Sequence, residues 1–285
     1  MSYIKAGQDA NGNAINLFYE DWGQGAPVVL IHGWPLDHTM WEHQMMELPK
    51  HGLRVVAYDR RGFGKSSRPW ESYDYDTLAD DLKAVLDTLD LQNVTLVGFS
   101  MGGGEVARYM SRHGGARVSK VAFISAVPPY LLKTADNPTG VDKSVFDEML
   151  AGIQKDRFDF LSGFGKQFFN VSMISHPVSQ AVLDWSQTVT SLASPKATYD
   201  CAVSFATTDF RQDLATIKVP TLIVHGDADQ TVPIEASGAQ TAKHLPHAQY
   251  LVYSGAPHGL FFTDKDRLSQ DLLAFAGKAS TQAGL

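Results

Sequence analysis

A serine enclosed by closely spaced glycines places the tightest limit on how this chain can fold. Residues 98–102 read Gly-Phe-Ser-Met-Gly, directly after the apolar residues 94–97 and directly before residues 103–109, which suit a helix. This order predicts a strand, a very tight turn and a helix, with Ser100 at the apex of the turn. So tight a turn strains the serine backbone and leaves no space for side chains at the flanking glycines. The hydroxyl that it exposes is typical of covalent hydrolases.

The rest of the chain supplies the context for this turn. We expect strands at residues 27–31, 54–58, 94–97, 118–125, 219–224 and 249–253, and helices at 41–48, 77–89, 236–244 and 265–275. This alternation is typical of parallel strands joined by right-handed helical crossovers. Because the strands are apolar throughout, helices should cover both faces of the sheet. Two more strands, at 3–5 and 15–22 around the turn Asn11-Gly12, predict an antiparallel edge.

The alternation stops between residues 127 and 217. This segment contains helical stretches such as 144–154 and is rich in aromatic residues. We predict a helical cap insertion at residues 127–217, above an α/β core formed by residues 1–126 and 218–285. Most of its aromatic side chains should form the interior of the cap, and some should line an apolar pocket.

Composition excludes several classes of partner. The 285 residues carry a formal net charge of −7 and no basic stripe, which argues against nucleic acid as a partner. The chain has no signal pattern and no apolar stretch near the roughly 20 residues that span a bilayer, so we expect no membrane association. A single cysteine, Cys201, favours a reducing, cytoplasmic setting and a buried apolar role.

A serine nucleophile needs a base, and the base needs an acid to orient it. The expected chain order in a sheet of this kind is serine, acid, histidine. Residues 225–233, directly after an apolar strand, offer Asp227 and Asp229. We assign the acid to Asp229, which lies deeper in the loop, and expect Asp227 to hydrogen-bond within the turn. His258 follows the last strand and the acid, which favours it as general base over a structural loop histidine.

Backbone N–H groups must also stabilise the negative charge that forms on a substrate carbonyl. One donor should be the amide of Met101, directly after the nucleophile, and the other should lie in residues 32–35. Pro35 has no N–H, so we expect the amide of Trp34, whose indole would wall the pocket. His32 is expected to brace this loop through side-chain hydrogen bonds.

No motif in the chain requires a cofactor or a metal. Residues 59–66 contain two glycines after a strand, but no nucleotide fingerprint follows them, and we interpret them as a structural turn. No cluster of cysteine and histidine has the spacing of a zinc site. We therefore expect neither a cofactor nor a metal.

Together these motifs resemble the α/β-hydrolase superfamily over residues 3–275. The matching segments are residues 32–36, 59–64, 98–105, 225–233 and 258–260. Within the superfamily the chain looks like the cofactor-free (non-haem) haloperoxidases, also called perhydrolases, and like the bacterial aryl esterases. The resemblance implies a mostly parallel eight-stranded sheet with an antiparallel N-terminal edge, helices on both faces and a helical cap.

Carried over residue by residue, the resemblance implies Ser100 as nucleophile, Asp229 as acid and His258 as base. It also implies an oxyanion hole formed by the amides of Trp34 and Met101. A proline at position 35 would turn the preceding carbonyl into the site, where it would accept a hydrogen bond from hydrogen peroxide. The expected substrate pocket consists of Trp34, Pro35, Met101, Phe164, Phe205 and Val232.

The implied activity is hydrolysis of small carboxylic esters through an acyl-enzyme, with formation of peracids when hydrogen peroxide replaces water. The partners would be a small ester or carboxylic acid and hydrogen peroxide, and relatives of this kind often form homo-oligomers. A γ-lactamase, a lactonase or a carbon–carbon bond hydrolase would use the same triad and stays an alternative. A ligand receptor with a slow triad is an alternative of another class.

Overall fold

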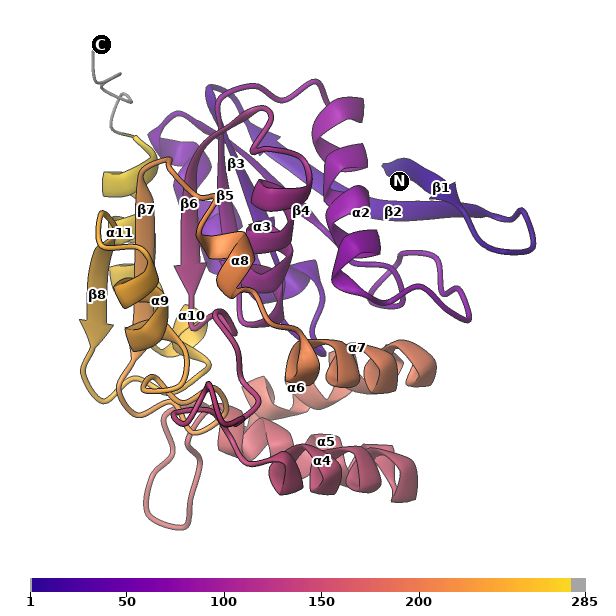
Figure 1. Ribbon diagram of the computed structural model, residues 1–285, viewed down its shortest axis with the longest axis vertical. Helices are drawn as coiled ribbons and strands as arrows, with labels where there is room; N and C mark the ends of the chain where they lie inside the picture. Colours follow the sequence, from indigo (N-terminus) through magenta and orange to yellow (C-terminus); the bar gives the residue numbers. More distant parts are fainter. Residues whose placement is uncertain (1, 278–285) are drawn as a thin grey trace.

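Eight strands form one sheet in residues 2–277, the part of the chain that the computed structural model describes (Figure 1). The strands are β1 (Tyr3–Gln8), β2 (Ala14–Gly23), β3 (Ala26–Ile31), β4 (Leu53–Tyr58), β5 (Val94–Phe99), β6 (Val118–Ile124), β7 (Thr221–Gly226) and β8 (Gln249–Tyr253). Their order is β1-β2-β4-β3-β5-β6-β7-β8. The pairs β1–β2 and β2–β4 are antiparallel, and the other neighbours are parallel. The predicted fold class and its antiparallel edge are confirmed.

Helices cover both faces of this sheet. They are η1 (His38–Trp41), α1 (Glu42–Glu47), η2 (Leu48–His51), α2 (Tyr75–Thr88), α3 (Met101–Arg112), α4 (Lys143–Lys155), α5 (Arg157–Phe168), α6 (Gln180–Leu192), α7 (Pro195–Thr207), α8 (Arg211–Leu214), α9 (Gly238–His244), α10 (Leu260–Thr263) and α11 (Lys265–Ala276). One apolar core lies under α2 and α3, and a second core lies under α1, α10 and α11.

Successive residues of the central strand β3 enter different cores. Val28 and Leu30 belong to the core under α1, α10 and α11, whereas Val29 and Ile31 belong to the core under α2 and α3. Side chains alternate between the two faces of a strand, so a sheet covered on both faces needs strands that are apolar throughout. The apolar strands in the sequence therefore correspond to a sheet buried on both sides, as expected.

The helix predicted at residues 41–48 is present as α1 (Glu42–Glu47), but the expected end before Pro49 is wrong. The 3-10 helices η1 and η2 extend the helical path on both sides of α1. Pro49 lies in the first turn of η2, where an N–H has no helical acceptor, so the helical path continues through the proline. Gly52 ends this path with a φ of 79°, a conformation that glycine adopts without strain.

Helices α4 to α7 lie together below the carboxyl ends of the parallel strands (Figure 1). Helix α4 packs on α5 and α7, and α5 packs on α6. These helices therefore cover the edge of the sheet where the parallel strands end and where the serine turn lies. The division of the chain into a cap at residues 127–217 and a core on either side stays a prediction.

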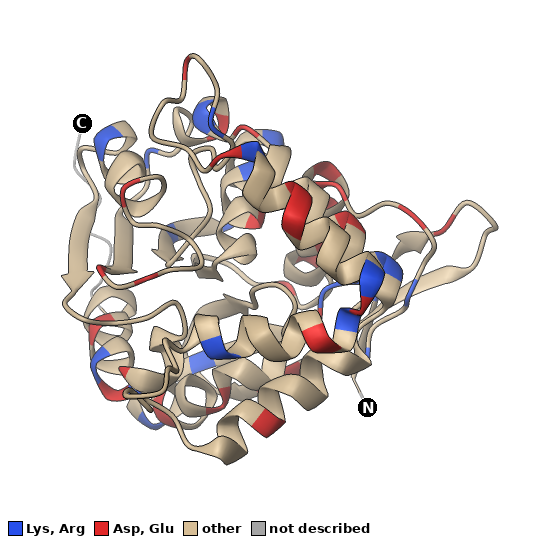
Figure 2. Ribbon diagram, turned by 90° about the horizontal axis from the view of Figure 1, so that it is seen from below, with Lys and Arg blue, Asp and Glu red and all other residues tan. Residues whose placement is uncertain are grey.

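Charged residues of both signs are mixed on the side of the molecule where α4 to α7 lie. Figure 2, which views the molecule from that side, shows acidic and basic positions interspersed, without a continuous basic band on the ribbon in view. None of the helices in residues 2–277 combines the length and apolarity that a bilayer crossing demands.

Candidate active site

Ser100 lies at the apex of the turn between β5 and α3, as the sequence pattern predicts. Its backbone has φ 52° and ψ −119°, which is a strained conformation for a residue with a side chain. A Cβ added at Gly98 would lie 2.5 Å from the carbonyl oxygen of Gly102. A Cβ added at Gly102 would lie 2.6 Å from the carbonyl oxygen of Ile31. Both glycines are therefore required by close approach of the backbone.

The structure brings Ser100, His258 and Asp229 into one hydrogen-bonded line. The Oγ of Ser100 is 3.0 Å from Nε2 of His258, and Nδ1 of His258 is 2.6 Å from Oδ2 of Asp229. The three residues follow β5, β8 and β7, whose carboxyl ends meet at one edge of the sheet. A carboxylate can only accept, so Nδ1 of His258 carries the proton, and Nε2 is free to accept the serine proton.

The carboxylate of Asp229 is held on both oxygens. Oδ1 accepts the N–H groups of Thr231 and Val232 at 2.9 and 2.8 Å, and Nε2 of His225 is 3.3 Å from Oδ2. Burial alone would raise the pKa of Asp229, but the electrostatic interaction with His258 and the hydrogen bonds from His225 and His258 outweigh it and lower the pKa below its usual range. Asp229 is therefore ionised and fixed in orientation. Sequence reasoning missed His225, although it lies four residues before Asp229.

The second acidic candidate, Asp227, has a different environment. Its Oδ1 accepts the N–H of Gly255 at 2.6 Å, which joins the loop after β7 to the loop after β8. It makes no hydrogen bond to His258 within the described residues. Asp227 thus holds the two loops together, which is the kind of turn role expected for it.

The two expected oxyanion donors lie on segments that flank Ser100. Met101 is the first residue of α3, where a helical N–H has no acceptor within the helix. Trp34 lies in the loop after β3, and this loop runs against the nucleophile turn. A Cβ added at Gly33 would lie 2.6 Å from the ring of Phe99 and 3.0 Å from Cβ of Ser100. The assignment of the two amides to an oxyanion hole stays a proposal.

A cavity of about 330 Å³ opens beside Ser100 and is lined in part by α4, α5 and α7. Four of the predicted pocket residues line it, namely Trp34, Phe164, Phe205 and Val232. Pro35 and Met101 are not among its lining residues. The side chain of Met101 belongs instead to the core under α2 and α3. Sequence reasoning missed several lining residues from α4, α5 and the loop after β7, namely Met149, Phe160, Glu148, Gln167, Gln230 and Thr231.

Helices α5 and α7 hold the indole of Trp34 in place. Its Nε1–H donates to the carbonyl oxygen of Thr198 in α7 at 2.9 Å. The ring makes edge-on contacts with Phe164 of α5 and Phe205 of α7, with centroid distances of 5.2 and 5.5 Å. These contacts fix one wall of the cavity and connect the loop after β3 to α5 and α7.

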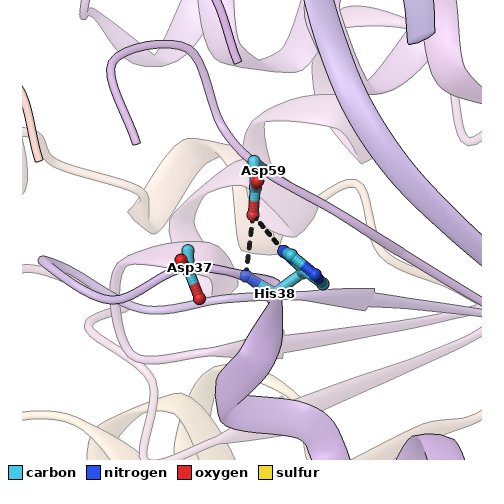
Figure 3. Close-up of side chains that lie close together, drawn as sticks. All are labelled: Asp37, His38 and Asp59. Carbon is cyan, nitrogen blue, oxygen red and sulfur yellow. Dashed lines mark hydrogen bonds and ion pairs between the residues drawn. The ribbon is translucent and has the colours of Figure 1, made fainter. Parts of the chain in front are cut away.

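Asp37, His38 and Asp59 form the one cluster within residues 2–277 whose side-chain atoms could hold a metal ion (Figure 3). Oδ1 of Asp59 accepts the backbone N–H of His38 at 2.8 Å and its Nδ1–H at 2.6 Å. Oδ2 of Asp59 accepts the N–H of Lys65 at 2.8 Å, and Asp37 accepts the N–H of Thr39 at 2.9 Å. N–H donors occupy both oxygens of Asp59 and Oδ1 of Asp37, and these bonds join the loops after β3 and β4.

This cluster should make stability depend on pH through His38. Burial lowers the pKa of His38, but the hydrogen bond to Asp59 and the charges of Asp59, Asp37 and Glu20 outweigh burial and raise the pKa. Because the pKa of His38 is higher in the folded than in the unfolded protein, its protonation stabilises the fold. This contribution is complete below the unfolded pKa of about 6.5 and is lost as the pH rises through the folded pKa. The free energy of unfolding lost in His38→Gln, measured with urea, should be larger at about pH 5.5 than at about pH 9. An equal loss at both pH values would contradict this.

The strand order and the serine turn are those of the α/β-hydrolase fold. Residues 26–265 match the family model described as alpha/beta hydrolase fold, and the chain belongs to this family. It is 48% identical over 276 residues to a putative non-heme chloroperoxidase of Synechocystis sp., a match that covers 96% of this chain and 99% of the relative. It is 42% identical over 267 residues to a bifunctional esterase/perhydrolase of Acinetobacter calcoaceticus, covering 92% and 96%.

Among solved structures, a bromoperoxidase from Bacillus anthracis superposes with a TM-score of 0.93 at 47% identity. The superposition covers 97% of this chain and 99% of that structure. The resemblance that the motifs predicted, both to the superfamily and to its non-haem haloperoxidases and esterases, is confirmed.

Proposed function

We propose that this protein is a serine hydrolase that cleaves small carboxylic esters through an acyl-enzyme and that it forms peracids when hydrogen peroxide takes the place of water. The observation that carries the proposal is the hydrogen-bonded line from Ser100 through His258 to Asp229 at the wall of the cavity. The names of the relatives, which include chloroperoxidases and an esterase/perhydrolase, support the same chemistry.

In the first half-reaction Ser100 Oγ attacks the substrate carbonyl while its proton passes to Nε2 of His258. The ionised Asp229 stabilises the positively charged imidazole and keeps it oriented. The negatively charged carbonyl oxygen accepts hydrogen bonds from the amide N–H groups of Trp34 and Met101. His258 then gives its proton to the departing alcohol, or to departing water when the donor is a free carboxylic acid.

In the second half-reaction a small nucleophile attacks the acyl-enzyme. Water gives the carboxylic acid, and hydrogen peroxide gives the peracid, with the proton again passing through Nε2 of His258 to Ser100 Oγ. The peracid would oxidise bromide or chloride in solution. Its O–O bond breaks, the terminal oxygen passes to the halide to give hypohalous acid, and the carboxylate is released. The role expected for Pro35, to aim the carbonyl of Trp34 at the peroxide, stays a prediction.

The cavity supports a small, mainly apolar substrate. Its volume of about 330 Å³ lies near the lower end of the range for small-molecule sites. Aromatic walls from Trp34, Phe160, Phe164 and Phe205 suit an alkyl or aryl group next to the ester. A cytoplasmic location and a homo-oligomeric state stay predictions, which cell fractionation and light scattering would test.

A paired assay tests the proposed function. One arm follows hydrolysis of p-nitrophenyl acetate, and the other follows halogenation of a chromogenic diketone in acetate buffer with hydrogen peroxide and bromide. Treatment with a serine-directed sulfonyl fluoride is expected to remove both activities in proportion, because both need the same acyl-enzyme. Halogenation that persists after esterase activity has been lost would show that the two reactions do not share a site.

A further inference from the structure

A buried ion pair lies next to the site, and the acyl-transfer steps make no use of it. The guanidinium of Arg60 and the carboxylate of Glu105 are almost completely shielded from solvent and contact each other directly. The hydroxyl of Tyr58 donates to Oε2 of Glu105 at 2.8 Å. Removing two charges from water is costly, and apolar residues of similar size would often stabilise a core equally well. Such a pair is therefore weak evidence for a purely stabilising role.

The pair joins the two segments that carry the expected oxyanion amides. Arg60 follows β4, and its Nη2 donates to the carbonyl oxygen of His32 at 2.6 Å, two residues before Trp34. Glu105 lies on α3, four residues after Met101 and on the same helical face. A shift of Arg60 relative to Glu105 would therefore move one amide relative to the other.

A second contact links the position of Arg60 to the direction of the Trp34 N–H. The backbone N–H of Arg60 donates to Nε2 of His32 at 2.9 Å, so the other ring nitrogen, Nδ1, carries the proton and donates to the carbonyl oxygen of Gly33 at 2.9 Å. A trans peptide group is planar, with its C=O and N–H pointing in opposite directions. Holding the Gly33 oxygen therefore fixes the direction of the Trp34 N–H.

His32 is neutral in this arrangement. Burial lowers its pKa well below the usual range, and the charge of Arg60 lowers it further. A neutral ring leaves Nε2 as an acceptor for the Arg60 N–H and keeps Nδ1–H as the donor to the Gly33 oxygen.

We propose that Arg60, paired with Glu105, is a positioning residue of the oxyanion hole, which sets the separation and direction of the Trp34 and Met101 amides. This inference rests on the proposed function, because it concerns an oxyanion that forms during acyl transfer. Neither residue touches the substrate. The effect of losing the pair should therefore appear in transition-state stabilisation and leave substrate binding nearly unchanged.

The decisive comparison is between Arg60→Met and the double variant Arg60→Met/Glu105→Leu. Each protein is titrated with an activated phosphonate ester to count active serines, and kcat per titrated site, KM, thermal midpoint and affinity for a trifluoromethyl ketone analogue are measured. Arg60→Met is expected to lower kcat and analogue affinity by roughly 10- to 100-fold, with KM changed little. The double variant should regain thermal stability but not kcat.

Arg61 provides a matched control at the next position. Its guanidinium forms another buried pair, with Asp81 at 2.6 and 2.7 Å, and makes no hydrogen bond to His32 or α3 within the described residues. Arg61→Met should lower the thermal midpoint and leave kcat per titrated site unchanged. If Arg60→Met does not fold, Arg60→Lys is measured in its place, because lysine keeps the charge but loses the planar fork.

Two results would overturn the proposal. One is a double variant that recovers kcat together with stability, and the other is an Arg60 variant whose kcat per titrated site equals that of the unsubstituted protein. Failure of the proposed function is distinguishable, because the unsubstituted protein would then neither react with the phosphonate nor turn over esters.

Discussion

Ser100→Ala is expected to lower kcat for ester hydrolysis by on the order of a millionfold, because Ser100 carries the hydroxyl that hydrogen-bonds to His258 and forms the proposed acyl-enzyme. Peroxide-dependent halogenation should fall with it, since the peracid arises from the same intermediate. The measurements are initial rates in both assays, together with mass spectrometry of the protein after mixing with p-nitrophenyl acetate. The acetyl adduct should appear on the unsubstituted protein and be absent from the variant.

Ser125→Ala is the matched control for this prediction. Ser125 directly follows β6, the neighbour of β5, is fully buried, and its hydroxyl has no hydrogen-bond partner within the described residues. It should keep both activities. Halogenation that survives Ser100→Ala would mean that the peracid, and with it the proposed second half-reaction, does not depend on Ser100.

Asp229→Asn is expected to lower kcat by about 10⁴-fold while the fold is kept. An amide at this position removes the negative charge next to Nδ1 of His258, and its NH₂ group favours the tautomer in which Nε2 is protonated and cannot accept the serine proton. The measurement is kcat for p-nitrophenyl acetate, with circular dichroism and thermal unfolding of the same samples.

Asp227→Asn separates this electrostatic role from a loop effect. The amide oxygen of asparagine can still accept the N–H of Gly255, so activity should stay within a few-fold of that of the unsubstituted protein. A large loss in Asp227→Asn with a small loss in Asp229→Asn would reverse the assignment of the acid.

The residues of the Ser–His–Asp line could be predicted because each lies in a recognisable local sequence pattern. The turn at Ser100 needs glycines two residues away on each side, and the structure shows backbone within 2.6 Å of both missing Cβ positions. Asp229 and His258 follow apolar strands, and the carboxyl ends of parallel strands meet at one edge. Strand patterns and chain order are thus enough to bring these three residues together.

The lining of the cavity could be predicted only in part, because it depends on how the cap helices turn. Phe160, Phe164 and Phe168 lie four residues apart on one face of α5, and the first two line the cavity while the third packs edge-on against His258 at 4.8 Å. Phe158, only two residues earlier, is largely exposed. Helical spacing could have placed Phe160, Phe164 and Phe168 on one helix face. The sequence does not show which face points at the sheet, because that depends on tertiary packing.

The bracing role of His32 was predicted, but its contact with Arg60 and the other polar braces of the site could not be predicted from the sequence. Arg60 and Glu105 are 45 residues apart, and His38 and Asp59 are 21 apart. Each residue taken alone reads as an ordinary surface charge, since Arg, Glu and Asp are seldom fully buried. Their burial becomes visible only when β3, β4 and α3 are packed side by side. The interpretation of residues 59–66 as a structural turn therefore underestimated what Arg60 contacts.

The hydrogen bond from the Trp34 indole to Thr198 has a consequence for engineering. A chimera that carries the cap helices of another esterase would exchange the acceptor and the two phenylalanine rings that hold this indole. Because Trp34 is also the proposed oxyanion donor, we expect selectivity and turnover to change together in such a chimera. Grafts that alter the preferred ester should also slow acylation unless position 34 and its new neighbours are redesigned as one unit.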